Sequence, residues 1–344
     1  MPRVWTDTYT FLSGAVASPQ LAFFVTHDDE TAAERTPYSS FLTLKEGVWI
    51  DGGTRPWPTV SVAAIPGDMI QLIALGEAGQ IFLKGGGEER EEVIVKGDEG
   101  PATRGPLRCI RAVGGQVYAV GSDRQVYRRK GPSRWEAYDV GTRPESAMTD
   151  KMLGKPVAPV DKAPPKKKAE RSRPKNPPAP APAKSAAHTS TIGFEAIDGY
   201  SITELYAVGH RGEVWQWEGT RWIQRESGLG EKDVLTLLTC AVDGQAYAAG
   251  KKGLLLKGRG ETWEKLPSGL TDDITGLRLF DGQLYAMTHK GLYLHDGHKL
   301  VAVALPKKDA PKTFGSLDAT RESLWCIGAK DIFTYDGKTW TRVE

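Results

Sequence analysis

The residue cluster with the most obvious chemistry is His27-Asp28-Asp29-Glu30, which places three carboxylates next to an imidazole. Carboxylate oxygens are the ligands that Ca²⁺ and Mg²⁺ prefer, so the cluster could contribute to a hard-cation site. Such a site needs further oxygen ligands placed nearby. Without them we interpret the cluster as a solvated turn and predict no metal site.

Known catalytic motifs are absent from the rest of the sequence. It contains no P-loop, no GxSxG or HExxH motif, and no Cys and His residues at the spacing of a zinc site. Cys109, Cys240 and Cys326 are odd in number and lie in apolar stretches. We interpret them as small core residues rather than a disulfide framework. The sequence therefore predicts a protein that is not an enzyme and needs no cofactor.

Composition and the N-terminal residues bear on the compartment. The chain has 344 residues, of which 40% are hydrophobic and 26% charged, as in ordinary globular proteins. No apolar run approaches the ~18 residues of a membrane span. The first residues, MPRVWTDTYTF, lack the apolar segment of a secretory signal. Together with the cysteines, these features predict a cytoplasmic protein that does not cross a membrane.

A second group of polar side chains indicates binding rather than catalysis. Short turns between apolar segments carry basic residues or His, and the members of this group are His27, Arg124, His210, Arg211, Lys251, Lys252, His289, Lys290 and Lys330. If these turns share one face, their positive charge would attract an acidic protein partner. The alternative interpretation is that hairpin turns simply favour Lys and Gly.

Short antiparallel strands must position these turns. Residues 205–222, LYAVGHRGEVWQWEGTRW, read as two strands joined by the turn HRG, followed by the start of a third. Variants of this stretch place Tyr118, Tyr206, Tyr247, Tyr285 and Trp325 in register, and the last three steps are 41, 38 and 40 residues. A period of about 40 residues with several strands per unit is typical of β-propeller blades. We predict an all-β, monomeric, seven-bladed propeller, with six or eight blades as alternatives.

Each blade is expected to run from an inner strand a through strands b and c to an outer strand d. In this architecture the b–c turns and the d–a loops lie on the same face, which would bring the basic turns together. Tryptophans recur on the expected d strands at Trp135, Trp222, Trp263 and Trp340. We interpret them as packing between blades. The first two blades follow the pattern less regularly than the last five.

Residues 141–190 interrupt the repeat. They contain ten Pro, nine Ala and eleven Lys or Arg but only four acidic residues, so the segment carries +7 and the remainder of the chain −5. Because the segment offers little apolar surface to offset the entropy of ordering, we predict a disordered basic insert. The expected division is blades 1–3 in residues 1–140, the insert in 141–190, and blades 4–7 in 191–344. The insert contains no aromatic residue for base stacking, so we do not expect nucleic acid to be the partner.

Deleting residues 144–184 is expected to leave the melting temperature nearly unchanged. Shortening a flexible connection alters the closure entropy only slightly, and the insert is predicted to bury nothing. Thermal denaturation of the deletion variant tests this expectation. A loss of several degrees, or aggregation, would show that the insert is a folded part of the protein.

The repeats also resemble known families. Residues 205–229, LYAVGHRGEVWQWEGTRWIQRESGL, resemble a repeat of bacterial propeller proteins related to the photosystem-assembly-factor-like and sialidase-like (Asp-box) propellers. Residues 335–340, YDGKTW, are similar to a shortened Asp-box, and residues 117–135 resemble the repeats of tectonin-type lectin propellers. The resemblance covers blades 3 to 7 and implies the architecture. A sialidase-like site would require an arginine triad, for which Arg108, Arg111 and Arg278 are the candidates, but we expect these side chains to line a wet central channel.

Two functional classes follow from these observations. The first is a non-catalytic propeller that binds another protein through its loops, as an adaptor, an assembly factor or an immunity protein that neutralises a toxin. The second, suggested by the resemblance, is a carbohydrate-binding or glycosidase-like propeller. A carbohydrate site would place clustered carboxylates or aromatic residues in the central funnel. We favour the first class.

Overall fold

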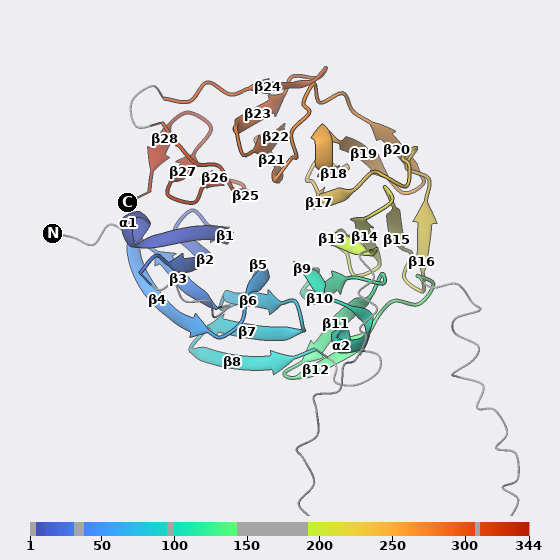
Figure 1. Cartoon of the computed structure of the whole chain (residues 1–344), viewed down its shortest axis with the longest axis horizontal. Helices are drawn as coiled ribbons and strands as arrows, with labels where there is room; N and C mark the ends of the chain where they lie inside the picture. The colour runs from blue at the N-terminus through green and yellow to red at the C-terminus, as the bar shows by residue number, and fades with distance from the viewer. Residues whose placement is uncertain (1–4, 31–37, 95–99, 143–191, 307–309, 344) are drawn as a thin grey trace, which may run out of the picture.

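The computed structural model of the chain describes residues 5–30, 38–94, 100–142, 192–306 and 310–343. They form seven four-stranded antiparallel sheets arranged around a central axis, which confirms the predicted seven-bladed propeller (Figure 1). Helix within the described residues is limited to α1 (Trp5–Thr8), α2 (Pro101–Arg104) and the 3₁₀ turn η1 (Lys251–Gly253). None of these helices has the length or the apolar character required to cross a membrane. The predicted insert, apart from its first two residues, lies outside the described residues.

Each blade is one continuous segment whose strands follow one another from the axis outward. The strands of blades 1 and 2 are β1 (Tyr9–Ser18), β2 (Leu21–Asp28), β3 (Ser39–Lys45), β4 (Val48–Arg55), β5 (Thr59–Ile65), β6 (Gln71–Gly76), β7 (Gln80–Gly85) and β8 (Glu88–Val93). Those of blades 3 and 4 are β9 (Leu107–Val113), β10 (Gln116–Gly121), β11 (Val126–Gly131), β12 (Arg134–Ala137), β13 (Phe194–Ser201), β14 (Glu204–Gly209), β15 (Val214–Trp217) and β16 (Trp222–Arg225).

The remaining three blades have shorter and more regular strands. Blade 5 comprises β17 (Leu235–Cys240), β18 (Ala246–Gly250), β19 (Leu255–Arg259) and β20 (Thr262–Lys265). The strands of blades 6 and 7 are β21 (Gly276–Phe280), β22 (Gln283–Thr288), β23 (Gly291–His295), β24 (Leu300–Ala302), β25 (Ser316–Ala319), β26 (Leu324–Ile327), β27 (Ile332–Tyr335) and β28 (Trp340–Arg342).

Two-residue turns connect the inner strands a and b of two blades. Gly114 and Gly115 join β9 to β10 with φ angles of 56° and 76°, and Asp281 and Gly282 join β21 to β22 with 48° and 71°. Positive φ at both central residues gives a turn whose twist matches the flanking strands. The Gly-Gly and Asp-Gly pairs in the sequence therefore determine where these hairpins reverse.

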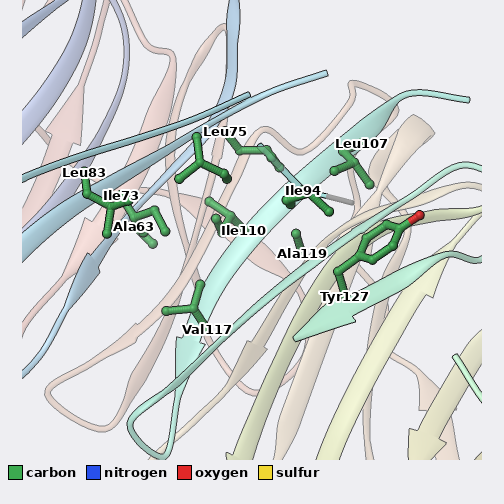
Figure 2. Close-up of a cluster of buried hydrophobic side chains, with 11 residues drawn as sticks. Ala63, Ile73, Leu75, Leu83, Ile94, Leu107, Ile110, Val117, Ala119 and Tyr127 are labelled. Atoms are coloured by element: carbon green, nitrogen blue, oxygen red, sulfur yellow. The ribbon is translucent and has the colours of Figure 1, made fainter. Parts of the chain in front are cut away.

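The hydrophobic core lies between successive blades. Figure 2 shows the cluster between blades 2 and 3, in which Ile73 and Leu75 of β6 pack with Ile110 of β9 and Tyr127 of β11. All four side chains are fully buried. Because side chains alternate between the two faces of a strand, a strand buried on both faces must be apolar almost throughout. This packing explains the uninterrupted apolar b strands of the repeat, such as LIAL in β6.

The ring closes between blade 7 and blade 1 without exchange of a strand. The Phe11 N–H donates a hydrogen bond to the Ala329 carbonyl (2.9 Å), and the Val16 N–H donates to the Asp318 carboxylate (2.8 Å). Trp325 of β26 is buried in the same apolar cluster as Phe11. Hydrogen bonds and apolar packing thus hold the seam, as they hold the other pairs of neighbouring blades.

Three of the predicted d-strand tryptophans, Trp135, Trp222 and Trp263, contact the preceding blade, as the sequence predicts. Trp222 of β16 is 2% exposed, and its Nε1–H donates to the Tyr138 carbonyl just beyond β12 (2.7 Å). Trp263 of β20 lies edge-on to Tyr206 of β14, with ring centroids 5.6 Å apart. These rings fill the gaps between outer strands, where blades diverge from the axis.

Glu92 of β8 is a buried carboxylate that joins blade 2 to blade 3. It accepts hydrogen bonds from Trp135 Nε1 (3.1 Å) and from Arg129 Nε and Nη2 (3.0 and 2.6 Å). Burial acts to raise the pKa of Glu92, but Arg129 and the other donors outweigh it and hold the pKa below its ordinary value of 4.5. A lowered pKa means that the ionised side chain stabilises the folded protein above the unfolded-state pKa, and that this contribution disappears as the pH falls through the folded-state pKa.

A Glu92→Gln variant is therefore expected to melt below the wild type at pH 7, by an amount that shrinks as the pH is lowered from about 5 to about 3. The reason is that the variant has no carboxylate to protonate over this range. Circular dichroism melts at a series of pH values measure the difference, with the exposed Glu231→Gln as the matched control. A difference that stays constant with pH would contradict the expectation.

Candidate functional site

The b–c turns and the d–a loops lie side by side, as predicted, and together form what we call the loop face. The b–c turns of blades 4 and 5 both bind the d–a loop between these blades. The Gly212 N–H donates to the Asp233 carbonyl (2.8 Å), and the Lys251 N–H donates to the Val234 carbonyl (3.1 Å). Backbone hydrogen bonds therefore fix the turns that carry the predicted basic residues.

Arg124, one of those residues, is bound within the protein. Its Nε and Nη2 donate to the two carboxylate oxygens of Glu213 on the next blade (2.6 and 2.5 Å), and Trp215 Nε1 donates to the same carboxylate (3.1 Å). Hydrogen bonding to Glu213 raises the pKa of Arg124 against the opposing effect of burial. Arg124 thus joins blade 3 to blade 4, and its guanidinium is already matched by a carboxylate that is only 7% exposed.

Two predicted lysines also have carboxylate partners on the loop face. Lys290 Nζ lies 2.8 Å from the Asp272 carboxylate, and the hydrogen bond to Asp272 raises the pKa of Lys290. Lys330 Nζ forms an ion pair with Asp29 and donates to the Tyr9 carbonyl (3.0 Å) across the seam of the ring. Both side chains are thus already paired with a carboxylate of the protein.

The three predicted histidines occupy different environments. The placement of His27 in a turn is wrong: it lies within β2, where its ring packs against Tyr38 with centroids 5.4 Å apart. His210 is half-buried, with Nδ1 3.2 Å from Arg108 Nη1. His289 is exposed at its turn. Of these three histidines only His289 is exposed, and its Nδ1 lies 3.3 Å from the Phe314 carbonyl oxygen.

Arg211, Lys251 and Lys252 are the remaining predicted basic residues, and all three are exposed. Within the described part of the chain, none of them forms an ion pair. Arg211 and Lys252 hold equivalent positions in successive turns, with φ angles of 62° and 56°. Among the described basic residues of the b–c turns, those without an ion pair therefore lie on blades 4 and 5, rather than in the complete ring that the sequence suggests.

A groove runs beside these residues, between the b–c turn of blade 5 and the d–a loop that follows β20. Its polar lining includes Lys251, Lys252, Lys265 and a single acidic residue, Asp233. Its apolar lining comes mainly from the d–a loop and includes Leu266, Pro267 and Leu270. The groove thus combines a positive rim with an apolar wall.

The axial channel is lined by inner strands from all seven blades. Arg108, Arg111 and Arg278 all line it, as predicted. Arg108 forms an ion pair with Glu195, and Arg278 Nε lies 2.8 Å from the Asp318 carboxylate. Because Arg108 and Arg278 are paired with carboxylates, the three candidate arginines do not form an unpaired triad that could bind an anionic substrate.

Arg111 and Glu195 show how the channel wall balances charge. Burial acts to lower the pKa of Arg111, but the carboxylates of Asp198 and Asp318 raise it overall. Burial raises the pKa of Glu195 even though Arg108 and His210 favour its ionised form. Among the described residues, no group of three or more His, Cys, Asp or Glu side chains is arranged to hold a metal ion.

The sequence interpretation missed the carboxylates that compensate the basic turns, namely Glu195, Glu213, Asp272 and Asp29. Glu213 carried a weak local signal, because it follows the turn HRG directly and precedes an apolar strand. Asp29 was considered only as a metal ligand. The other partners come from neighbouring blades, which sequence spacing alone does not pair.

The whole chain can be compared with known protein families and solved structures. No family model matches the chain. Among solved structures, the chain resembles the WD40 β-propeller domain of Doa1 (TM-score 0.60, 12% identity, 94% of this chain and 91% of that one). It also resembles YCF48 bound to a D1 peptide (TM-score 0.58, 16% identity, 95% and 91%). At these identities the two likenesses concern the fold alone.

A comparison of sequences gives a much higher identity than these structural likenesses do. The chain is 34% identical to the immune protein Tsi7 of Pseudomonas aeruginosa over 349 aligned residues, which cover the whole of both proteins. This relationship fits the predicted protein-binding function, of which an immunity protein was one form, rather than the carbohydrate-binding alternative. Identity at this level over the full length shows common descent, and the chain belongs to the family of the immune protein Tsi7.

Proposed function

We propose that this chain is an immunity protein that neutralises a protein toxin by binding it through the loop face, without catalysing a reaction. The observation that carries the proposal is its full-length similarity to an immune protein. Neutralisation by binding requires only a rigid, complementary surface, and the loop face offers turns that are fixed by backbone hydrogen bonds. The propeller then serves as the scaffold that holds those turns in place.

The proposed toxin surface is acidic. Arg211, Lys251 and Lys252 supply exposed positive charge, and long-range attraction between opposite charges raises the rate of association. The b–c turns of blades 3 to 7 contain no Phe, Tyr or Trp on which a nucleic acid base could stack. A protein partner is therefore favoured over a nucleic acid.

We further propose that the protein acts as a monomer in the cytoplasm. Cys109, Cys240 and Cys326 are all free thiols, and burial raises the pKa of each above its ordinary value. A raised pKa keeps the thiols protonated and unreactive, as expected of structural residues in a reducing compartment.

The test is capture of the partner followed by a protection assay. The tagged chain is used to isolate proteins from the native host, and products of neighbouring genes are sought among them. Each captured protein is then expressed in susceptible cells with and without the chain. The expected result is a protein that stops growth alone, permits growth when the chain is present, and forms a complex with the chain after purification. Captured proteins that are all harmless, or protection without a complex, would disprove the proposal.

A further inference from the structure

We propose that the partner-binding site is confined to the part of the loop face over blades 4 and 5, where it receives an acidic segment that carries an apolar anchor. This inference rests on the proposed function and adds two features to it. It specifies which part of the face binds, and it specifies the chemistry of the partner segment.

The first argument is the distribution of uncompensated charge. Lys290 and Lys330 lie on the loop face but pair with carboxylates, whereas Lys251 and Lys252 make no ion pair within the described residues. A partner carboxylate that approached Lys290 or Lys330 would have to compete with an existing partner. Among the described b–c turns, attraction is therefore strongest over blades 4 and 5, which lie next to each other in the ring (Figure 1).

The second argument is the groove beside Lys251 and Lys252. Three lysines and one aspartate line it, while Leu266 and Leu270 on its wall are only partly buried. A partner side chain such as Leu or Phe could cover these leucines, and flanking carboxylates would then reach Lys251, Lys252 or Lys265. Hot spots of protein interfaces are commonly built in this way, with an apolar anchor at the centre and polar or charged side chains around it.

The third argument is the strained conformation of the turns. Arg211 and Lys252 lie in the left-handed region, where Gly is the favoured residue. The Lys252 N–H donates to the Asp273 carboxylate (2.9 Å), and the Gly212 N–H binds the Asp233 carbonyl beside the groove. Long cationic side chains at positions better suited to Gly, on turns that are held in place, indicate a function for those side chains.

A synthetic peptide provides a direct test. The probe is a fluorescent peptide of glutamates with leucine at every fourth position, and the measurement is its anisotropy on titration with the full chain at low salt. We expect the wild type to bind and Lys251→Gln/Lys252→Gln to bind about tenfold or more weakly. Lys290→Gln/Lys338→Gln removes the same charge elsewhere and is expected to bind like the wild type. Equal weakening in the two double variants, or no binding by the wild type, would overturn the proposal.

Carbodiimide cross-linking of the bound peptide locates the site independently. The reagent joins a glutamate carboxylate to a nearby lysine amine, and mass spectrometry identifies the lysine. We expect cross-links at Lys251, Lys252 and Lys265. Equal labelling of Lys290 and Lys330 would overturn the proposal, as would complete displacement of the peptide by an equimolar short DNA duplex, since the surface would then favour nucleic acid.

The outcomes separate this inference from the proposed function. The peptide assays contain no toxin, so their failure in a chain that protects cells would remove the inference and leave the function intact. Binding and localised cross-linking in a chain that protects against no captured protein would support the acidic site and disprove the immunity function.

Discussion

A Trp222→Ala variant is expected to lose about 3–5 kcal/mol of unfolding free energy, the largest change that we predict for a single side chain. Trp222 is 2% exposed and belongs to the cluster between blades 3 and 4, with its ring centroid 6.1 Å from that of Phe194 and 5.9 Å from that of Trp217. Removing the indole leaves a cavity that the surrounding strands cannot close, and it also leaves the Tyr138 carbonyl without its donor.

Two further variants show which part of the indole stabilises the protein. Trp222→Phe keeps an aromatic ring but removes the Nε1–H, so it is expected to cost less than the alanine variant, about 1–3 kcal/mol. Val242→Ala alters a side chain that is 86% exposed and is expected to change stability by less than about 0.5 kcal/mol. Urea denaturation followed by circular dichroism measures all three. A Trp222→Ala variant within about 1 kcal/mol of the wild type would contradict the proposed packing role.

The fold was predictable from the sequence because its signals are local. The b strands are buried on both faces, so LIAL in β6 and LYAV in β14 appear as continuous apolar runs. Gly-Gly and Asp-Gly fix the reversals that follow strand a in blades 3 and 6. Such signals recur at the blade period, and the architecture can be predicted without knowledge of any long-range contact.

The charge pattern of the loop face was not predictable in the same way. Arg124 pairs with Glu213, 89 residues away, and Lys330 pairs with Asp29, 301 residues away. These pairs depend on which turns become neighbours when the ring closes. The position of His27 was also missed, because β2 continues through it to pair with the start of β1.

Lys252 and Lys290 show most clearly why the ion pairs of the loop face could not be predicted from the sequence. Both follow a b strand in turns of similar sequence, so the sequence predicts the same role for both. In the structure, two consecutive aspartates on the d–a loop between blades 5 and 6 bind different parts of these two lysines. Asp272 pairs with the Lys290 ammonium, whereas Asp273 accepts the backbone N–H of Lys252 and makes no ion pair with its side chain. One lysine is compensated and the other remains available to a partner.

Replacing Arg211 and Lys252 by Gly is expected to slow association with the proposed toxin partner by about ten- to a hundredfold at low salt, while leaving the fold intact. Both residues have positive φ angles, a conformation that disfavours L residues and suits Gly. Relief of this strain offsets the greater flexibility of Gly in the unfolded chain, so the unfolding free energy is expected to change by no more than about 1 kcal/mol. The double variant thus separates binding from stability.

Stopped-flow association rates at low and at physiological salt, for the wild type and each variant, measure this effect. Because ions screen exposed charges, the difference between wild type and Arg211→Gly/Lys252→Gly is expected to shrink as salt is raised. Lys290→Glu is the control on the same face. It is expected to alter the rate less than Lys252→Glu does, since Lys290 lies between β22 and β23 of blade 6, outside the proposed site over blades 4 and 5. Equal association rates for the wild type and the glycine variant at low salt would rule out this part of the loop face as the site of encounter.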